Sequence, residues 1–312
     1  METRTLGRSD LRVSVVGLGC NNFGGRIDLA ATRRVVDRAL DLGVTLLDTA
    51  DVYGNRGGSE TFLGEILGPR RAKTVLATKF GLPMDEAGTM KGGAPQYIRA
   101  AVEASLRRLK TDWIDLYQLH RPDPATPIED TLRTLDELIR SGKVRYIGCS
   151  NLTAQQVVEA QDVARRHGLH GFVSCQNEYS LLVRDVEQEL VPVMQKEGLG
   201  LLPYFPLASG LLTGKYRRGA PLPPDSRFTK MTGLGDRYLT DRNWDKVEAL
   251  EKFCADRGRS LLELAFSWLA SRPTVASVIA GATKPEQVEA NVRAVGWTLT
   301  ADELAEIDQL TA

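Results

Sequence analysis

Short apolar segments alternate along the chain with longer segments in which apolar residues recur every three to four positions. The short segments predict buried strands and the longer ones predict amphipathic helices, as in consecutive parallel β/α units. The eight predicted strands cover residues 13–18, 44–47, 74–78, 114–119, 144–148, 171–175, 198–204 and 275–279. The predicted helices between them cover 29–42, 59–67, 95–109, 127–141, 153–167 and 186–197.

Eight β/α units with continuous apolar strands favour an α/β fold of the closed (β/α)8 TIM barrel type. An open doubly wound sheet remains the alternative. A dinucleotide-binding open sheet should carry G-x-G-x-x-G after its first strand, but Asn22 stands where the third glycine would follow Gly17 and Gly19. Any nucleotide is therefore expected to bind in another way.

Four segments depart from the alternation. Residues 3–13 predict an N-terminal β-hairpin, and residues 215–241, rich in Pro, Gly and Arg, predict a long loop at the mouth of the barrel. Residues 243–269 predict two helical segments divided at Gly258, and the chain from Thr300 predicts an added C-terminal helix. No shift in composition divides the chain, so we expect one domain over residues 1–312.

Composition narrows the class of partner. Lys and Arg together number 40, as do Asp and Glu, so no net charge favours nucleic acid or an anionic membrane. We therefore expect the partner to be a small molecule or another protein. The N-terminus shows no apolar signal segment, and the four cysteines lie far apart without metal-binding spacing. These features indicate a cytoplasmic protein without a disulfide framework or structural zinc.

Polar residues follow three consecutive predicted strands. Asp48, Lys79 and His120 end the second, third and fourth strands, and Tyr53 lies in the loop after the second. The carboxyl ends of barrel strands meet on one face, so we expect these side chains to converge there. Each residue alone has an ordinary structural interpretation, such as a turn carboxylate or a surface charge. Asp51 competes with Asp48 but lies outside the apolar segment, so we expect a turn residue.

This set predicts proton transfer. An ammonium group beside a phenol lowers the phenol pKa, so Lys79 is expected to tune Tyr53. The carboxylate of Asp48 would keep Lys79 charged and in place. The imidazole of His120 could then donate a hydrogen bond to a substrate carbonyl oxygen.

Several of these segments together resemble the aldo-keto reductases. They are Leu-Asp-Thr-Ala-Asp-Val-Tyr-Gly (47–54), Thr-Lys (78–79), Asp-Leu-Tyr-Gln-Leu-His (115–120) and Gly-Cys-Ser-Asn (148–151), and the similarity covers essentially the whole chain. The resemblance implies a (β/α)8 barrel that reduces aldehydes, ketones or sugars with NADPH, or oxidises the alcohol. It also implies a catalytic tetrad of Asp48, Tyr53, Lys79 and His120, with Tyr53 as the general acid.

The same resemblance implies a set of cofactor-binding residues. Ser150, Asn151 and Gln176 would hold the nicotinamide carboxamide, and Tyr204 would stack on the ring. Residues 206–215 with Arg227 would face the pyrophosphate, and the segment from Gly281 would hold the adenosine end, with Thr283 and Gln287 at a 2′-phosphate. The full set is Gly19, Cys20, Asn21, Asp48, Ser150, Asn151, Gln176, Tyr204, Phe205, Pro206, Leu207, Ala208, Ser209, Gly210, Lys215, Arg227, Gly281, Thr283, Gln287 and Asn291.

Two departures from the family pattern affect the cofactor. Phe205 stands where many relatives have serine, and Ala290 stands where many have glutamate. The 2′-phosphate site also lacks paired Lys and Arg, so NADH is possible besides NADPH. We expect the substrate pocket to be walled by residues 20–23, Val52, Phe80, Arg121 and the 215–241 loop; Arg121 would suit an anionic or polyhydroxylated substrate.

Two other functions fit parts of the sequence. The potassium-channel β subunits share the predicted fold and cofactor, so a regulatory binding module with little turnover is one alternative. A barrel lyase or isomerase that uses Lys79 for Schiff-base or acid–base chemistry is another, but it gives no role to Tyr204 or Gln176. The sequence leaves monomer and homo-oligomer undecided.

Overall fold

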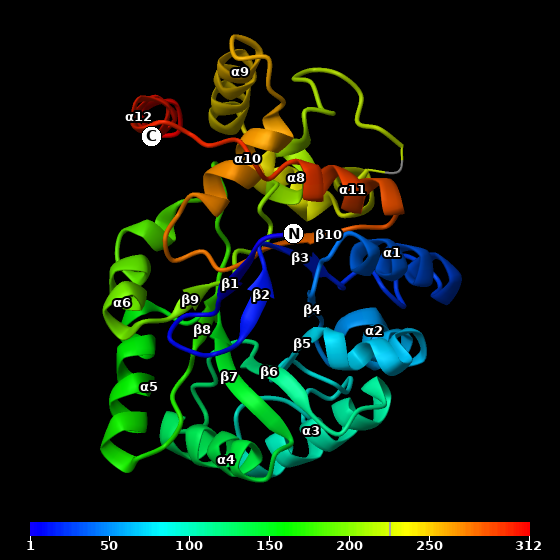
Figure 1. The fold of residues 1–312 in the computed structure, drawn as a ribbon, viewed down its shortest axis with the longest axis vertical. Helices are drawn as coiled ribbons and strands as arrows, with labels where there is room; N and C mark the ends of the chain where they lie inside the picture. The colour runs from blue at the N-terminus through cyan, green and yellow to red at the C-terminus, as the bar shows by residue number, and fades with distance from the viewer. Residues whose placement is uncertain (225) are drawn as a thin grey trace.

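The computed structural model describes residues 1–224 and 226–312, and in them eight parallel strands form one curved sheet (Figure 1). The strands are β3 (Val16–Gly19), β4 (Leu46–Asp48), β5 (Val75–Phe80), β6 (Ile114–Leu119), β7 (Val144–Ser150), β8 (Ser174–Gln176), β9 (Gly200–Leu201) and β10 (Val278–Gly281). The sheet order is β10-β3-β4-β5-β6-β7-β8-β9, so consecutive strands are neighbours.

The two ends of this sheet meet. Leu201 of β9 forms a parallel bridge with Val275, which lies just before β10. The N–H of Leu201 donates to the carbonyl of Thr274 at 2.7 Å, and the N–H of Ala276 donates to the carbonyl of Leu201 at 3.0 Å. The predicted (β/α)8 barrel is therefore confirmed, and the open doubly wound alternative is wrong because an open sheet would leave these ends unpaired.

Helices surround the strands (Figure 1). The main ones are α1 (Leu29–Asp41), α2 (Tyr53–Leu67), α3 (Pro95–Leu109), α4 (Ile128–Arg140), α5 (Ala154–His167), α6 (Leu190–Glu197), α9 (Asp241–Ala255), α10 (Leu261–Ala270), α11 (Pro285–Arg293) and α12 (Ala301–Leu310). Short 3-10 turns are η1 (Gly68–Lys73), η2 (Asp185–Glu187) and η3 (Ala208–Thr213). In the described parts of the chain, no helix combines the length and apolar character that crossing a bilayer requires.

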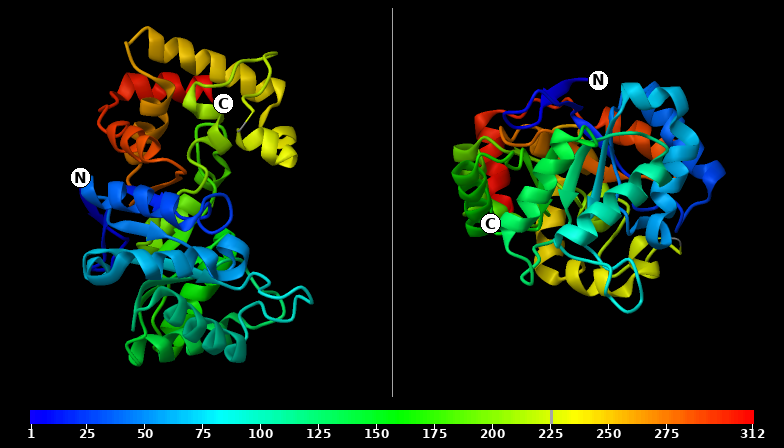
Figure 2. Two further views of the ribbon diagram at one scale, coloured as in Figure 1. Left: turned by 90° about the vertical axis from the view of Figure 1, so that its right-hand side faces the viewer. Right: turned by 90° about the horizontal axis from the view of Figure 1, so that it is seen from below.

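The helix ends follow the punctuation in the sequence. Thr153, Ser260 and Thr300 each form a capping box at the start of a helix, which satisfies N–H groups that have no partner within the helix. Gly168 and Gly198 end α5 and α6 in the left-handed conformation that glycine adopts at little cost. The predicted break between two helices near Gly258 and the C-terminal helix from Thr300 are both confirmed. Figure 2 shows α9 and α12 together at one end of the molecule.

Two predicted segments differ from the structure. Residues 215–241 are not simply a loop, because α7 (Arg227–Lys230) and α8 (Thr232–Tyr238) lie within them; residue 225, also in the predicted loop, lies outside the described residues. The side chain of Ser226 caps α7, and this local hydrogen bond was missed in a stretch dominated by Pro and Gly. The predicted helix 186–197 is divided into η2 and α6.

The hairpin closes the apolar end of the barrel. Strands β1 (Thr3–Thr5) and β2 (Arg12–Ser14) pair antiparallel, as predicted. The side chains of Leu6, Leu11 and Val13 pack against Leu46 of β4 and Ala77 of β5 in one buried cluster. Side chains alternate along a strand, so the inward positions two residues further along β4 and β5 lie above this apolar floor. Those positions carry Asp48 and Lys79.

Candidate active site

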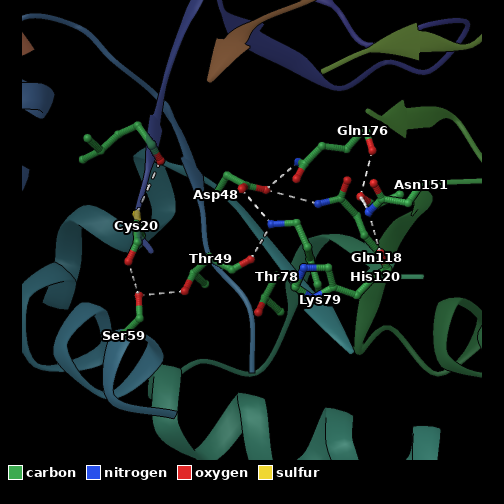
Figure 3. Close-up of polar contacts among 12 residues, drawn as sticks. Cys20, Asp48, Thr49, Ser59, Thr78, Lys79, Gln118, His120, Asn151 and Gln176 are labelled. Carbon is green, nitrogen blue, oxygen red and sulfur yellow. Dashed lines mark hydrogen bonds and ion pairs between the residues drawn. The ribbon is translucent and has the colours of Figure 1, made fainter. Parts of the chain in front are cut away.

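Asp48 and Lys79 form a buried ion pair inside the barrel. Lys79 Nζ lies 2.7 Å from Asp48 Oδ2, and the Lys79 side chain is completely buried (Figure 3). Nζ also donates to the carbonyl oxygen of Thr49 at 2.9 Å. Burial acts to lower the pKa of Lys79, but the Asp48 carboxylate and Tyr53 outweigh it, so the pKa is raised. Lys79 therefore carries a fixed positive charge at neutral pH.

Tyr53 lies beside this charge. The ammonium of Lys79 is 5.1 Å from the centroid of the Tyr53 ring. Tyr53 directly precedes residues 54–57, all of which have positive φ, and a Cβ on Gly54 would lie 2.4 Å from the carbonyl oxygen of Phe23. Glycine is therefore required at the turn that orients the tyrosine.

Lys79 acts to lower the pKa of Tyr53, as predicted, but the net pKa is raised. Burial raises the pKa of Tyr53, and the opposing effect of Lys79 is smaller, while Asp48 adds a further increase. The sequence indicated the cation but not the extent of burial. A raised pKa keeps the phenol protonated at neutral pH, which is the state that a proton donor needs.

His120 follows β6 and faces the tyrosine. The two rings lie edge to face, with centroids 5.7 Å apart. Burial lowers the pKa of His120 to about 2, and the positive charges of Lys79 and Arg121 contribute. The ring is therefore neutral at physiological pH. Its Nδ1 atom is buried and has no hydrogen-bond partner among the described residues.

Two side-chain amides donate hydrogen bonds to the Asp48 carboxylate. Gln176 Nε2 donates to Asp48 Oδ1 at 2.9 Å, and Gln118 Nε2 donates to the same oxygen at 3.3 Å (Figure 3). Gln118 was not predicted from the sequence. It lies on β6 two residues before His120 and opposite Lys79 in the strand register. Strand alternation was the signal that could have identified it.

The residues expected to hold the nicotinamide carboxamide are joined to one another by hydrogen bonds. Asn151 Nδ2 donates to Ser150 Oγ and to the carbonyl oxygen of His120, each at 3.0 Å. Ser150 Oγ donates to the carbonyl oxygen of Gln176 at 2.7 Å, and Tyr204 Oη donates to Asn151 Oδ1 at 2.8 Å. The structure thus brings these four polar residues together beside His120.

A cavity of about 710 Å³ opens onto these side chains. Asp48, Tyr53 and His120 line it, whereas Lys79 lies beneath them. Most of the expected cofactor residues also line the cavity, and they are Gly19, Cys20, Asn21, Asp48, Ser150, Asn151, Gln176, Tyr204, Phe205, Pro206, Leu207, Ser209, Gly210, Lys215, Arg227, Gly281, Thr283, Gln287 and Asn291. Ala208 does not line it, because its side chain is fully buried in the core.

The aldo/keto reductase family model matches residues 15–312, which include every strand of the barrel. The chain belongs to the aldo/keto reductase family. Several relatives share about the same length. A probable voltage-gated potassium channel subunit beta of Oryza sativa subsp. japonica is 40% identical over 302 residues, which cover 95% of this chain and 91% of the relative.

Two bacterial relatives carry the names of oxidoreductases. The L-glyceraldehyde 3-phosphate reductase of Escherichia coli (strain K12) is 35% identical over 321 residues, covering 99% of this chain and 92% of the relative. An uncharacterized oxidoreductase of Bacillus subtilis (strain 168) is 35% identical over 320 residues, covering 99% and 96%. The relatives of this chain therefore include proteins named as enzymes and proteins named as channel subunits.

The lining of the cavity agrees only in part with the expected substrate wall. Arg121 and residues 20–22 line the cavity, but Phe23, Val52 and Phe80 do not. Phe80 follows the inward Lys79 on β5, so alternation directs it outward, where its ring packs 4.6 Å from that of Tyr117. Residues of the 215–241 loop line the cavity, as expected, among them Met231 and Arg237. Lining residues that the sequence did not suggest include Arg26, Leu82 and Leu262.

Asp51 lies in a turn, as predicted, but it is buried: only 1% of it is exposed. Its Oδ2 atom accepts a hydrogen bond from Tyr97 Oη at 3.1 Å. The carboxyl group faces the helix layer outside the barrel and not the cavity. A buried acid this close to Tyr53 has a larger structural role than a surface turn residue.

Proposed function

We propose that this chain reduces the carbonyl group of an aldehyde, ketone or sugar by hydride transfer from NADPH, or oxidises the corresponding alcohol. The observation that carries the proposal is the completely buried Lys79, which Asp48 holds beneath Tyr53 at the wall of the cavity. A buried cation is costly unless it has a role or a partner, and here it lies next to Tyr53, which lines the cavity and packs edge to face against His120.

The cavity wall near residues 205–215 suits the phosphates of a dinucleotide. Ser209 Oγ and Arg227 Nε are buried atoms without a hydrogen-bond partner in the described part of the chain, and Lys215 lines the same cavity. Ser209 and Gly210 have positive φ. A bound anion would satisfy these groups, because buried polar atoms are costly when unpaired. When bound, the cofactor would supply the hydride.

At the nicotinamide end, the residues Ser150, Asn151 and Gln176 would hold the carboxamide by exchanging some of the hydrogen bonds they now make with one another. Thr283 and Gln287 at the other end are hydrogen-bonded, with the Thr283 N–H donating to Gln287 Oε1 at 2.7 Å. Neither carries a charge, so we expect NADPH to be preferred over NADH by only a modest factor.

The protein residues would then handle the proton. Tyr53 keeps its proton at neutral pH because burial raises its pKa, and Lys79 would stabilise the phenolate that forms when the proton moves to the carbonyl oxygen. His120, whose pKa of about 2 makes it neutral, would orient the same oxygen with a ring N–H. In this scheme the proton donor, Tyr53, and the hydrogen-bond donor, His120, are both neutral before the reaction.

Arginines at the cavity suggest which substrates to test first. Arg26 and Arg121 line it, and neither forms an ion pair with another described residue. The E. coli relative is named for a phosphorylated aldehyde. We therefore propose that anionic or polyhydroxylated aldehydes are better substrates than neutral aldehydes of similar size.

The test is the change of nicotinamide absorbance during turnover with a panel of carbonyl compounds. Tyr53→Phe should lower kcat by at least about a thousandfold while leaving the Kd for NADPH nearly unchanged, because it removes only the transferable proton. Tyr146→Phe, on β7 but outside the cavity lining, is the matched control and should retain activity. A Tyr53→Phe enzyme as active as the control would refute the assignment.

A regulatory subunit is the second candidate, since the rice relative is named as a probable potassium-channel subunit beta. In that function, binding of the cofactor would modulate the activity of a partner protein, and carbonyl reduction would be slow. Tight NADPH binding without turnover on any carbonyl in the panel would favour it. Prompt multiple turnover would favour the reductase.

A further inference from the structure

The loop between Asp48 and Tyr53 is fixed to the neighbouring strand. The N–H of Thr49 donates to the carbonyl of Ala77 at 2.8 Å, and the N–H of Asp51 donates to the carbonyl of Lys79 at 3.0 Å. The hydroxyl of Thr49 also contacts Ser59 of α2, as Figure 3 shows. The position of Tyr53 therefore depends on how this loop lies along β5.

The side chain of Asp51 joins the loop to the helix layer. Its Oδ2 atom accepts from Tyr97 Oη of α3, whereas its Oδ1 atom is buried and without a hydrogen-bond partner in residues 1–224 and 226–312. No lysine or arginine in the described chain forms an ion pair with it. An ionised carboxylate at this place would be poorly compensated.

A second buried acid makes ionisation harder. Glu60 of α2 is fully buried, accepts from Thr78 Oγ1 at 2.6 Å and pairs with Arg108 of α3 at 2.7 Å. The Arg108 guanidinium donates hydrogen bonds to Glu60 and to Ser105, and it acts on Asp51 only through its charge. Tyr117 of β6 also faces this cluster, and burial raises its pKa.

Asp51 therefore titrates near neutrality. Burial raises its pKa to about 7, and Glu60 contributes to the increase. The hydrogen bond from Tyr97, the charge of Arg108 and the backbone of Val52 act in the opposite direction but are outweighed. Since Oδ1 has no hydrogen-bond partner among the described residues, the anion would need further stabilisation from movement of the loop or entry of water.

We propose that Asp51 and Tyr97 are a positioning pair: protonated Asp51 holds the 49–53 loop against β5, and loss of its proton releases the loop and displaces Tyr53. This rests on the proposed role of Tyr53 as proton donor. Asp51 itself does not line the cavity, so it acts on the reaction only through the loop. The arrangement makes reduction sensitive to pH near neutrality.

The first arm of the test is the pH profile of kcat and kcat/KM for carbonyl reduction between about pH 5.5 and 9. If the Asp51 proton is required, kcat of the wild type falls about tenfold between pH 6 and 8, because the apparent pKa is near 7. Asp51→Asn should remove that decrease, leaving less than a twofold change. Asp10→Asn, an exposed carboxylate in the hairpin, is the matched control and should keep the wild-type profile.

Tyr97→Phe separates positioning from general loss of structure. It removes the hydrogen bond that lowers the Asp51 pKa, so the decrease in kcat should move to higher pH instead of disappearing. An Asp51→Asn enzyme that keeps the tenfold decrease would overturn the proposal. So would a Tyr97→Phe profile that coincides with the wild type.

The second arm is independent of turnover. Hydrogen exchange of the Asp51 and Tyr53 amides, which donate to the carbonyls of Lys79 and Ala50, reports on the loop directly. After correction for the intrinsic rate, protection should be lower at pH 8.5 than at pH 5.5 in the wild type and equal in Asp51→Asn. If no carbonyl is reduced, the proposed function fails while this arm still tests the loop; equal protection in the wild type at both pH values would overturn the inference itself.

Discussion

Replacement of Asp51 by Asn should stabilise the protein above neutral pH. Asn is close in shape to the protonated acid and can accept the same hydrogen bond from Tyr97, but it cannot ionise. The wild-type carboxyl group has a pKa raised from 3.8 to about 7, chiefly by burial. The substitution therefore removes an unfavourable charge and leaves the neutral contacts in place.

The sign and size follow from proton linkage. Because the pKa is raised, folded protein binds the proton more tightly than unfolded protein does, so stability is lost as pH rises from 3.8 to about 7. The loss proceeds at about 1.4 kcal/mol per pH unit and reaches about 4 kcal/mol in total. Between about pH 5 and 8.5, Asp51→Asn should gain about 2.7 kcal/mol relative to the wild type.

The assay is urea unfolding followed by far-UV circular dichroism at both pH values, with m-values compared to confirm that the same transition is measured. Asp10→Asn removes an exposed carboxylate and serves as the control, with a pH-independent difference from the wild type. A difference between Asp51→Asn and the wild type that is the same at both pH values, or that favours the wild type at high pH, would show that Asp51 does not carry the raised pKa.

Two further substitutions test the packing beneath the site. Asp48→Asn and Lys79→Met should each cost about 3 to 5 kcal/mol, because each leaves a buried partner unpaired, and the double variant should cost clearly less than their sum; additive costs in urea unfolding would contradict a coupled pair. A Cβ on Gly64 would lie 2.2 Å from the carbonyl oxygen of Arg108, so Gly64→Ala should lower the free energy of unfolding by about 1 to 3 kcal/mol. Gly233→Ala, which meets open space, should be nearly neutral, and equal thermal shifts for both would exclude the clash.

Much of the fold follows from periodicity, because parallel barrel strands are buried on both faces and read as apolar segments. The main differences between the predicted and observed elements occur where apolar residues show no regular spacing. The helices in 215–241 are short and begin at a local side-chain cap, Ser226, within a stretch of Pro and Gly. The division of the predicted helix 186–197 occurs near its start, where the turn at residues 185–187 tightens into a 3-10 helix.

The candidate site could be predicted where the position of a residue on its strand determines which way its side chain points. Asp48 and Lys79 were placed by the rule that strands of a barrel end on one face, and the structure brings them within 2.7 Å. Net pKa values were not predictable in the same way. They depend on burial, and burial comes from segments far away in sequence, as for Tyr53, whose pKa rises although a lysine lies beside it.

The pKa of Asp51 was likewise not predictable from the sequence, because its burial comes from the helix layer on the outer face of the sheet. Thr78 and Lys79 are consecutive on β5, and alternation sends the first to Glu60 in the helix layer and the second to Asp48 in the barrel. The loop after β4 crosses between these layers, so its backbone is bonded to β5 while its acid is buried among helices. The inner ion pair and the outer acid cluster therefore share the same two backbone segments. A change in the charge of Asp51 would therefore act on Tyr53 through the backbone of the 49–53 loop. This connection could not be inferred from the positions of the residues in the sequence.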